Sequence, residues 1–381
     1  MQLSSMVQLG LIGLLAACLP LAMVWMSSDP NKYRKLVWVT VFLTFDLIVF
    51  GAFTRLTDSG LGCPDWPGCY GAANPFLAHA EIVAAETLMP TGPVTVVKAW
   101  IEMIHRYLAM GIGVLIVALM GTAWVQWRKT RRTEFAPGLP TTLFVFVLIQ
   151  GAFGAWTVTL KLQPVIVTIH LLLGMGLLSM LVWLGARQNR AAALAHGRFT
   201  APAAATPSGA PTMLGRLALA AAVVLTIQIA LGGWVSTNYA TLACLDFPLC
   251  NGKVVPEMDF EHGFTLWREL GKTAAGHYLP FSALTAIHWV HRNFAFVVLA
   301  VLGLAAWRAR AHPGVARHAR GIAIVLAVQA ATGIATVYLN FPLTIAVLHN
   351  AGAALLVLMV TMLNYKIKYP SGPVLQASHH Q

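Results

Sequence analysis

Four histidines lie inside strongly apolar stretches of the sequence, where an ionisable side chain is costly and is therefore a functional candidate. They are His105, His170, His291 and His349, each about six to ten residues from the same end of its stretch. At about 1.5 Å per helical residue, all four would lie about 9–15 Å deep, in one layer. Two histidines at matched depth in one helical bundle suit the two axial positions of a haem iron. The pattern predicts two such haem sites.

A single histidine in a membrane often does no more than hydrogen-bond a neighbouring helix. That alternative is poor for four histidines at equivalent positions of an internal repeat, which is described below. Zinc is the other alternative, but a zinc site would need cysteine or carboxylate ligands within the bundle. The one candidate ligand of this kind that we identify is Glu102, which is too few. Haem also explains why each half of the chain contributes two ligands rather than three or four.

Glu102 precedes His105 by three residues, which places both on one face of a helix. It could transfer protons or stabilise a charged intermediate, or it could simply orient His105. The equivalent position in the second half is His288, three residues before His291. An acid in one half and an imidazole in the other suggest that one half performs chemistry while the other carries electrons.

Arginines directly follow two of the histidines. Arg106 and Arg292 are candidates to pair with haem propionates, and Arg55 could serve similarly. The alternative is that these side chains extend to the membrane surface.

Four cysteines form two pairs with C-x5-C spacing, Cys63 with Cys69 and Cys244 with Cys250. Both pairs lie in long loops that we place in an oxidising periplasm, so we expect two disulfides. Each would close a very short loop and so contribute little to global stability. Each disulfide would either fix the shape of a turn over the mouth of the bundle or take part in redox exchange. For Cys244 and Cys250 we favour the structural role. Cys18 is expected to be inert.

The elements that must position these residues are membrane helices. Of the 381 residues 58% are hydrophobic and 10% charged, which no soluble domain tolerates. Apolar stretches of about 20 residues recur, the length that crosses a hydrocarbon core of about 30 Å. We predict an all-α polytopic membrane protein with nine spans, at residues 6–26, 36–54, 98–126, 140–160, 165–185, 215–236, 281–306, 321–339 and 343–364.

The basic residues report the topology. The net charge is +12, and 17 of the 25 lysines and arginines fall in alternate connections, the positive-inside pattern. This places the N-terminus in the periplasm and the C-terminus in the cytoplasm of a multi-pass bacterial inner-membrane protein. Nucleic acid is excluded as a partner and the lipid bilayer is implied. The first span could be a signal sequence, but basic residues follow it rather than precede it, which favours a retained helix.

The chain contains an internal repeat. Residues 51–71 align with 232–252 at a constant offset of 181, and the histidines follow in the same order in both halves. Four spans per half give the halves the same orientation, related by an axis along the membrane normal. We therefore predict two parallel-repeat four-helix bundles, at 36–190 and 214–365. Around them lie an extra N-terminal helix and loop at 1–35, a flexible linker at 191–213, rich in Ala, Pro, Ser and Gly from 196, and a tail at 366–381.

The motifs FGAFTRLTDSGLGCPDWPGCYG (50–71) and EMIHR (102–106), with the repeated HR pair and the later histidines, resemble the haem A synthases. The resemblance covers about residues 36–365. Members of that family oxidise a methyl group of haem O to the formyl group of haem A, the cofactor of cytochrome oxidases. No GxGxxG or other nucleotide-binding motif is found, so electrons should come from elsewhere.

The resemblance implies roles for individual residues. His291 and His349 would ligate a haem b cofactor, and His105 and His170 would flank the substrate haem O, with Glu102 near its reacting edge. Cys63 and Cys69 match the family's first-loop disulfide. The implied partners are a haem O synthase (the farnesyltransferase) and an electron donor, either quinol or a ferredoxin-like protein. We also consider a homo-oligomer of this chain.

Two other functions compete with this one. A b-type cytochrome with bis-histidine haem would pass electrons between quinol and a periplasmic acceptor, but Glu102 and the unequal halves favour the enzyme. A transporter can also have repeats and polar residues within its spans. Histidines at one depth, without a helix broken by Gly and Pro at the midplane, argue against transport.

Overall fold

The computed structural model describes residues 5–197 and 213–370, and within them nine helices are long and apolar enough to cross a membrane. The predicted all-helical, multi-pass architecture is therefore confirmed. The spans are α1 (Ser5–Trp25), α2 (Lys32–Leu56), α4 (Val96–Thr130), α5 (Gly138–Thr159), α6 (Pro164–Ala195), α7 (Met213–Thr237), α9 (Phe281–Ala309), α10 (Ala316–Tyr338) and α11 (Leu343–Lys368). Short helices α3 (His79–Leu88) and α8 (Phe260–Phe264) and the 3-10 turn η1 (Thr133–Phe135) lie between them.

Local chemistry sets several helix ends. The Asn31 side chain accepts the Arg34 N–H at 2.9 Å at the start of α2, and Thr95 accepts the Lys98 N–H at 3.2 Å at the start of α4. Both are N-caps, which satisfy amide groups that the first helical turn leaves unpaired. Pro164 opens α6, at a position where its missing N–H costs nothing.

Helix α6 is longer than predicted, because it continues to Ala195 rather than ending near residue 185. The prediction followed hydropathy, which falls at Arg187. The polar extension is held by tertiary contacts instead: Arg187 donates to the Ala136 carbonyl at 3.2 Å and Gln188 to the Glu134 carbonyl at 2.6 Å. Most of the predicted linker, residues 198–212, lies outside the described residues.

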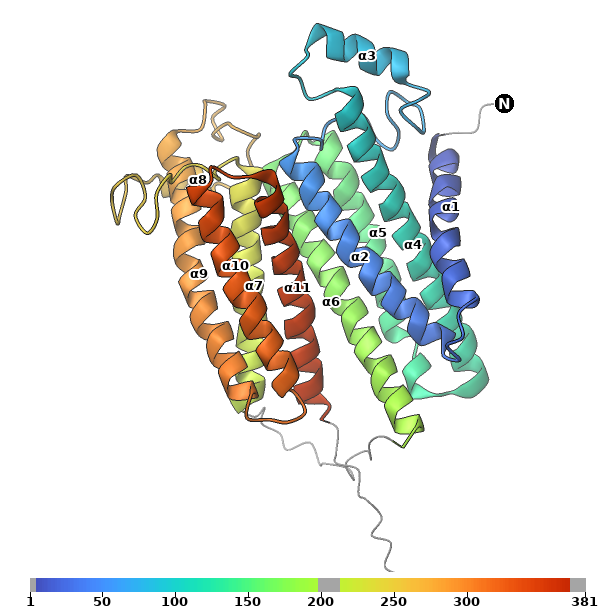
Figure 1. Cartoon of the computed structure of the whole chain (residues 1–381). Helices are drawn as coiled ribbons and strands as arrows, with labels where there is room; N and C mark the ends of the chain where they lie inside the picture. The colour runs from blue at the N-terminus through green and yellow to red at the C-terminus, as the bar shows by residue number, and fades with distance from the viewer. Residues whose placement is uncertain (1–4, 198–212, 371–381) are drawn as a thin grey trace, which may run out of the picture.

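The two halves repeat the same helix contacts. In the first, α2, α4, α5 and α6 contact one another in cyclic order, and in the second α7, α9, α10 and α11 do so. The halves meet through α2, α6, α7 and α11, which lie side by side in the centre of the molecule (Figure 1). Helix α1 lies outside the repeat and packs on α4, where Gly13 faces Met110 and Gly111 faces Ala16.

The two ends of the molecule differ. The loops with the cysteine pairs, together with α3 and α8, cover one end, which we call the disulfide end (Figure 1). The opposite end has the connections α1–α2, α4–α5 and α9–α10 and most of the basic clusters, and we call it the basic end. The histidine-bearing segments of α4, α6, α9 and α11 lie toward the disulfide end.

Repeat-equivalent residues meet each other at the disulfide end. Arg55, at the end of α2, donates to the carbonyl of Ser236 at 2.6 Å, and the Tyr239 hydroxyl donates to Asp58 at 2.7 Å. Both pairs are separated by the repeat offset of 181 residues. Equivalent residues can touch only beside the pseudo-two-fold axis, so these four residues mark it. We call them the axis cluster.

The axis cluster joins the halves by several interactions at once. The Arg55 guanidinium lies 4.1 Å over the Tyr239 ring and pairs with Asp58 at 3.2 Å. Burial raises the pKa of Tyr239, so its hydroxyl stays protonated and donates to Asp58. Because a charged donor meets a backbone carbonyl of the other half, the cluster should stabilise the contact between the halves.

We expect Arg55→Ala to weaken the junction by about 1.5–3 kcal/mol, the usual contribution of a hydrogen bond to a charged group. The purified protein in detergent should unfold at a lower temperature, measured by intrinsic fluorescence. The exposed Arg310, at the basic end, is the matched control and Arg310→Ala should leave the midpoint unchanged. Equal midpoints for the two variants would show that the axis cluster does not hold the halves together.

Candidate haem-binding site

Each of the four histidines packs against a glycine on a neighbouring helix. A Cβ added to Gly51 on α2 would lie 3.0 Å from Nε2 of His105, and one added to Gly154 on α5 would lie 3.1 Å from Cε1 of His170. Any side chain at these glycines would therefore push the imidazole aside. The glycines leave space for a ring between two closely packed helices.

The second half repeats this arrangement. A Cβ on Gly232 of α7 would lie 2.9 Å from Cε1 of His291, and one on Gly333 of α10 would lie 3.1 Å from Cε1 of His349. Gly51 and Gly232 are repeat-equivalent, as are Gly154 and Gly333. Matched glycines at constant offsets were visible in the sequence, but their role depends on which helices pack together.

Glutamines hold the backbone behind the histidines. Gln150 donates to the carbonyl of His170 at 3.1 Å, and its repeat equivalent Gln329 donates to the carbonyl of His349 at 2.9 Å. These hydrogen bonds link α5 to α6 and α10 to α11 at the level of the histidines. The sequence shows the two glutamines as a matched pair, but not this contact.

A cavity of about 230 Å³ opens in the second half, lined by both His291 and His349. Its wall includes Gln228 and Arg292 and also Leu171 from α6 of the first half. The amide nitrogen of Gln228 lies 3.2 Å from Nδ1 of His291. Two imidazoles from facing helices therefore share one mostly apolar space.

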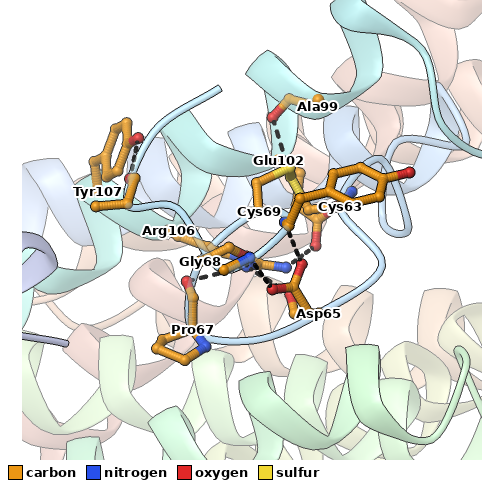
Figure 2. Close-up of a disulfide and its surroundings, with 12 residues drawn as sticks. Cys63, Asp65, Pro67, Gly68, Cys69, Ala99, Glu102, Arg106 and Tyr107 are labelled. Atoms are coloured by element: carbon orange, nitrogen blue, oxygen red, sulfur yellow. Dashed lines mark hydrogen bonds and ion pairs between the residues drawn. A yellow bond between two sulfur atoms is a disulfide. The ribbon is translucent and has the colours of Figure 1, made fainter. Parts of the chain in front are cut away.

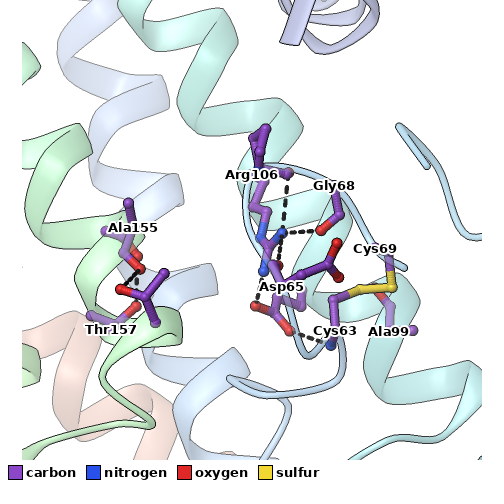
Figure 3. A network of polar contacts seen from close by, with 12 residues as sticks. Cys63, Asp65, Gly68, Cys69, Ala99, Arg106, Ala155 and Thr157 are labelled. Atoms are coloured by element: carbon purple, nitrogen blue, oxygen red, sulfur yellow. Dashed lines mark hydrogen bonds and ion pairs between the residues drawn. A yellow bond between two sulfur atoms is a disulfide. The ribbon is translucent and has the colours of Figure 1, made fainter. Parts of the chain in front are cut away.

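Glu102 fastens the first disulfide loop to α4 (Figure 2). It is 4% exposed, accepts the Cys63 N–H at 2.8 Å and pairs with Arg106 one turn later. Arg106 in turn donates to the carbonyls of Asp65, Pro67 and Gly68 at 3.0, 3.1 and 2.6 Å (Figure 3). Among the described residues these are the contacts of Glu102, and none is a hydrogen bond to His105.

The second half uses the same positions with different chemistry. Nδ1 of His288 accepts the Cys244 N–H at 3.2 Å, and Arg292 donates to the carbonyl of Leu249 at 2.9 Å. His288 is therefore the counterpart of Glu102 in contact as well as in sequence. Arg106 and Arg292, two of the three arginines that we considered for haem propionates, donate to loop carbonyls.

Both predicted disulfides are present, Cys63–Cys69 and Cys244–Cys250. An aspartate closes each loop: Asp65 accepts the N–H groups of residues 70 and 71 at 2.6 and 2.7 Å, and Asp246 those of residues 251 and 252 at 2.5 and 2.9 Å. The N–H groups of Gly252 and Asn251 hold the pKa of Asp246 below its usual range, and the Gly252 N–H has the larger effect. Gly71 and Gly252 have φ of +73° and +76°, which a side chain would resist.

The sequence reasoning overlooked Asp46, a second carboxylate within a span. It lies on an exposed face of α2 one turn after the exposed Phe42. Its repeat equivalent, Ile227, is also exposed, as a lipid-facing position requires. The rule that any ionisable residue within a membrane span is a functional candidate would have identified Asp46.

The residues present fit haem better than a metal held by protein alone. Each half offers two imidazoles backed by glycines, and the two in the second half line a common cavity. No cluster of three or more His, Cys, Asp or Glu suited to a metal occurs in the described parts of the chain. A porphyrin supplies four equatorial nitrogens, so two axial imidazoles complete its iron.

Comparison with known proteins agrees with this geometry. The sequence model of the cytochrome oxidase assembly protein family, COX15-CtaA, matches residues 34–361. The chain belongs to this family. The match begins after α1 and includes all four histidines and both disulfide loops, so the family resemblance stated from the motifs is confirmed.

Several curated relatives are named heme A synthase. That of Shewanella oneidensis is 37% identical over 341 residues, which cover 88% of this chain and 98% of the relative. That of a Chelativorans species is 30% identical over 379 residues, covering 93% and 97%. That of a Methylobacterium species is 31% identical over 352 residues, covering 86% and 90%. The similarity therefore extends over nearly the whole of each protein.

The glycine contacts predict a direct effect on haem. Gly333→Ala should displace His349 by a few tenths of an ångström and weaken haem retention in the second half on the order of 10-fold, the scale of an altered ligand environment. Gly303→Ala on α9 is the control, because a Cβ there meets nothing within 4 Å.

Alanine favours a helix over glycine by about 1 kcal/mol, so neither change should unfold its helix. The haem content of the two purified variants, determined by pyridine haemochrome spectra, provides the comparison. Full haem content in Gly333→Ala would show that the glycine does not position the ligand.

Proposed function

We propose that this chain is a haem A synthase, an oxidoreductase that converts a methyl group of haem O to the formyl group of haem A. Its family and its relatives named heme A synthase support this proposal. The observation that carries it is the set of four histidines, each backed by a repeat-equivalent glycine, which would provide two haem sites in one chain. A simple b-type electron carrier explains less well why the halves differ at Glu102 and His288.

We assign haem b to the second half and the substrate haem O to the first. His291 and His349 would hold the haem b iron from α9 and α11, and His105 and His170 would flank haem O from α4 and α6. When bound, haem b supplies one-electron transfer. The protein's part is to fix both pairs of imidazoles and to exclude water by packing the halves together.

Glu102 has two roles in this proposal. Its contacts with Cys63 and Arg106 anchor the first loop on the helix that contains His105. Those same contacts hold the carboxylate in one orientation, which a group that exchanges protons with a substrate requires. Arg106 and Arg292 would stabilise the loops above the sites and approach haem propionates with their remaining donors.

Two partners follow from the chemistry. A haem O synthase, the farnesyltransferase, must supply the substrate, and an electron donor of the quinol or ferredoxin-like class must exchange electrons with the haem b half.

The functional test is the haem composition of the protein and of a Glu102→Gln variant. Wild-type protein should copurify with haem b together with haem O, haem A or a partly oxidised intermediate, whereas an electron carrier would contain haem b alone. Glu102→Gln keeps the acceptor for the Cys63 N–H but removes the charge and the titrating proton. We expect haem A to fall about 100-fold or more, the range for lost acid–base catalysis, while haem b remains.

Glu86→Gln is the matched control, because Glu86 also accepts a backbone N–H at the disulfide end, that of Val96 at 3.0 Å. Chromatography of extracted haems gives the result for all three proteins. Near-normal haem A in Glu102→Gln would assign that residue to loop anchoring alone. Haem b alone in the wild type would reject the synthase.

We also propose the orientation in which the disulfide end faces the periplasm and the basic end the cytoplasm, as the positive-inside pattern requires. Alkaline phosphatase, which is active only outside the cytoplasm, should be active when fused after residue 75 and inactive after residue 132. The reverse pattern of activities would invert the orientation.

A further inference from the structure

The histidines of α6 and α11 differ in their ring contacts, although their positions are equivalent. Oγ of Thr332 on α10 lies 3.0 Å from Nδ1 of His349. The residue equivalent to Thr332 in the first half is Phe153, at the same offset of 179 that relates His349 to His170. Nδ1 of His170 is buried and has no hydrogen-bond partner.

The direction of the Thr332 contact follows from its other bond. The hydroxyl donates its single proton to the carbonyl of Gln329 at 3.1 Å, the residue three positions earlier on α10. Toward His349 it can therefore act only as an acceptor, which requires the proton of the imidazole to be on Nδ1. Nε2 then keeps its lone pair.

A second contact gives the same tautomer. The amide nitrogen of Gln329, which can only donate, lies 3.3 Å from Nε2 of His349. Nε2 must therefore be the acceptor nitrogen. Several other threonines in this protein also bond a carbonyl one turn earlier, but Thr332 is set apart by its additional contact with an imidazole.

We infer that Thr332 is a positioning residue that fixes the tautomer and orientation of His349, so that Nε2, which here accepts the Gln329 amide, keeps the lone pair that would bind a haem iron in the second half. Partners of this kind orient ligating histidines and make them more basic. His170 lacks such a partner and is freer to rotate or exchange its tautomer. The contrast makes His349 suited to a resident haem and His170 to a haem that must enter and leave. This inference rests on the proposed function and concerns these two histidines, since Nδ1 of His291 instead accepts the Gln228 amide.

The test compares Thr332→Val, Thr332→Ser and the wild type as purified holoproteins. Valine keeps the branched shape and removes the acceptor, whereas serine keeps the hydroxyl. The rate of haem b loss to excess apomyoglobin and the low-spin electron paramagnetic resonance signal are measured. We expect Thr332→Val to lose haem b on the order of 10-fold faster, with shifted g-values, and Thr332→Ser to match the wild type.

Phe153→Thr is the reciprocal variant, and it should slow loss of haem from the first half by giving His170 an acceptor. A Thr332→Val protein with the wild-type rate and spectrum would overturn the inference, as would equal losses from the Val and Ser variants. A wild type without haem b would count against the proposed function instead, so the two failures are distinct.

Discussion

An imidazole inside an apolar bundle needs room and a fixed direction, and in this protein glycines on neighbouring helices supply the room four times. Without them, α2 could not pack against α4, nor α5 against α6, at the separation that the rings occupy. The glutamine bonds to the backbone of His170 and His349 then fix the height of those histidines. The two sites therefore depend on helix separation before they depend on any polar contact.

The loops above the sites are part of the same construction. Glu102 and His288 each accept the N–H of the first cysteine of a disulfide loop, and the following arginines bind carbonyls farther along it. Each loop is thus fastened to the helix that also presents His105 or His291. A movement of either loop would be transmitted to that helix, because each loop is bonded to it at two points, through the acceptor side chain and through the arginine one turn later.

Sequence reasoning identified the histidines and Glu102, whose presence in a membrane is costly, and the paired cysteines of the loops. It placed the nine spans because length and hydropathy determine them. It did not find the glycine contacts or the Cys63 bond to Glu102, because these depend on how helices cross and loops return. The end of α6 was wrong because Arg187 and Gln188 are held by carbonyls near η1, which hydropathy cannot register. Asp46 was visible and overlooked.

The axis cluster also shows what a single chain gains over two identical subunits. In a symmetric dimer, the residue beside a two-fold axis faces its own copy, so an arginine would face an arginine and an aspartate an aspartate. Here Arg55 meets Ser236 and Asp58 meets Tyr239, two unlike pairs that symmetry would forbid. Joining the halves in one polypeptide therefore turns a position of enforced repulsion into one of attraction, and frees each half to specialise.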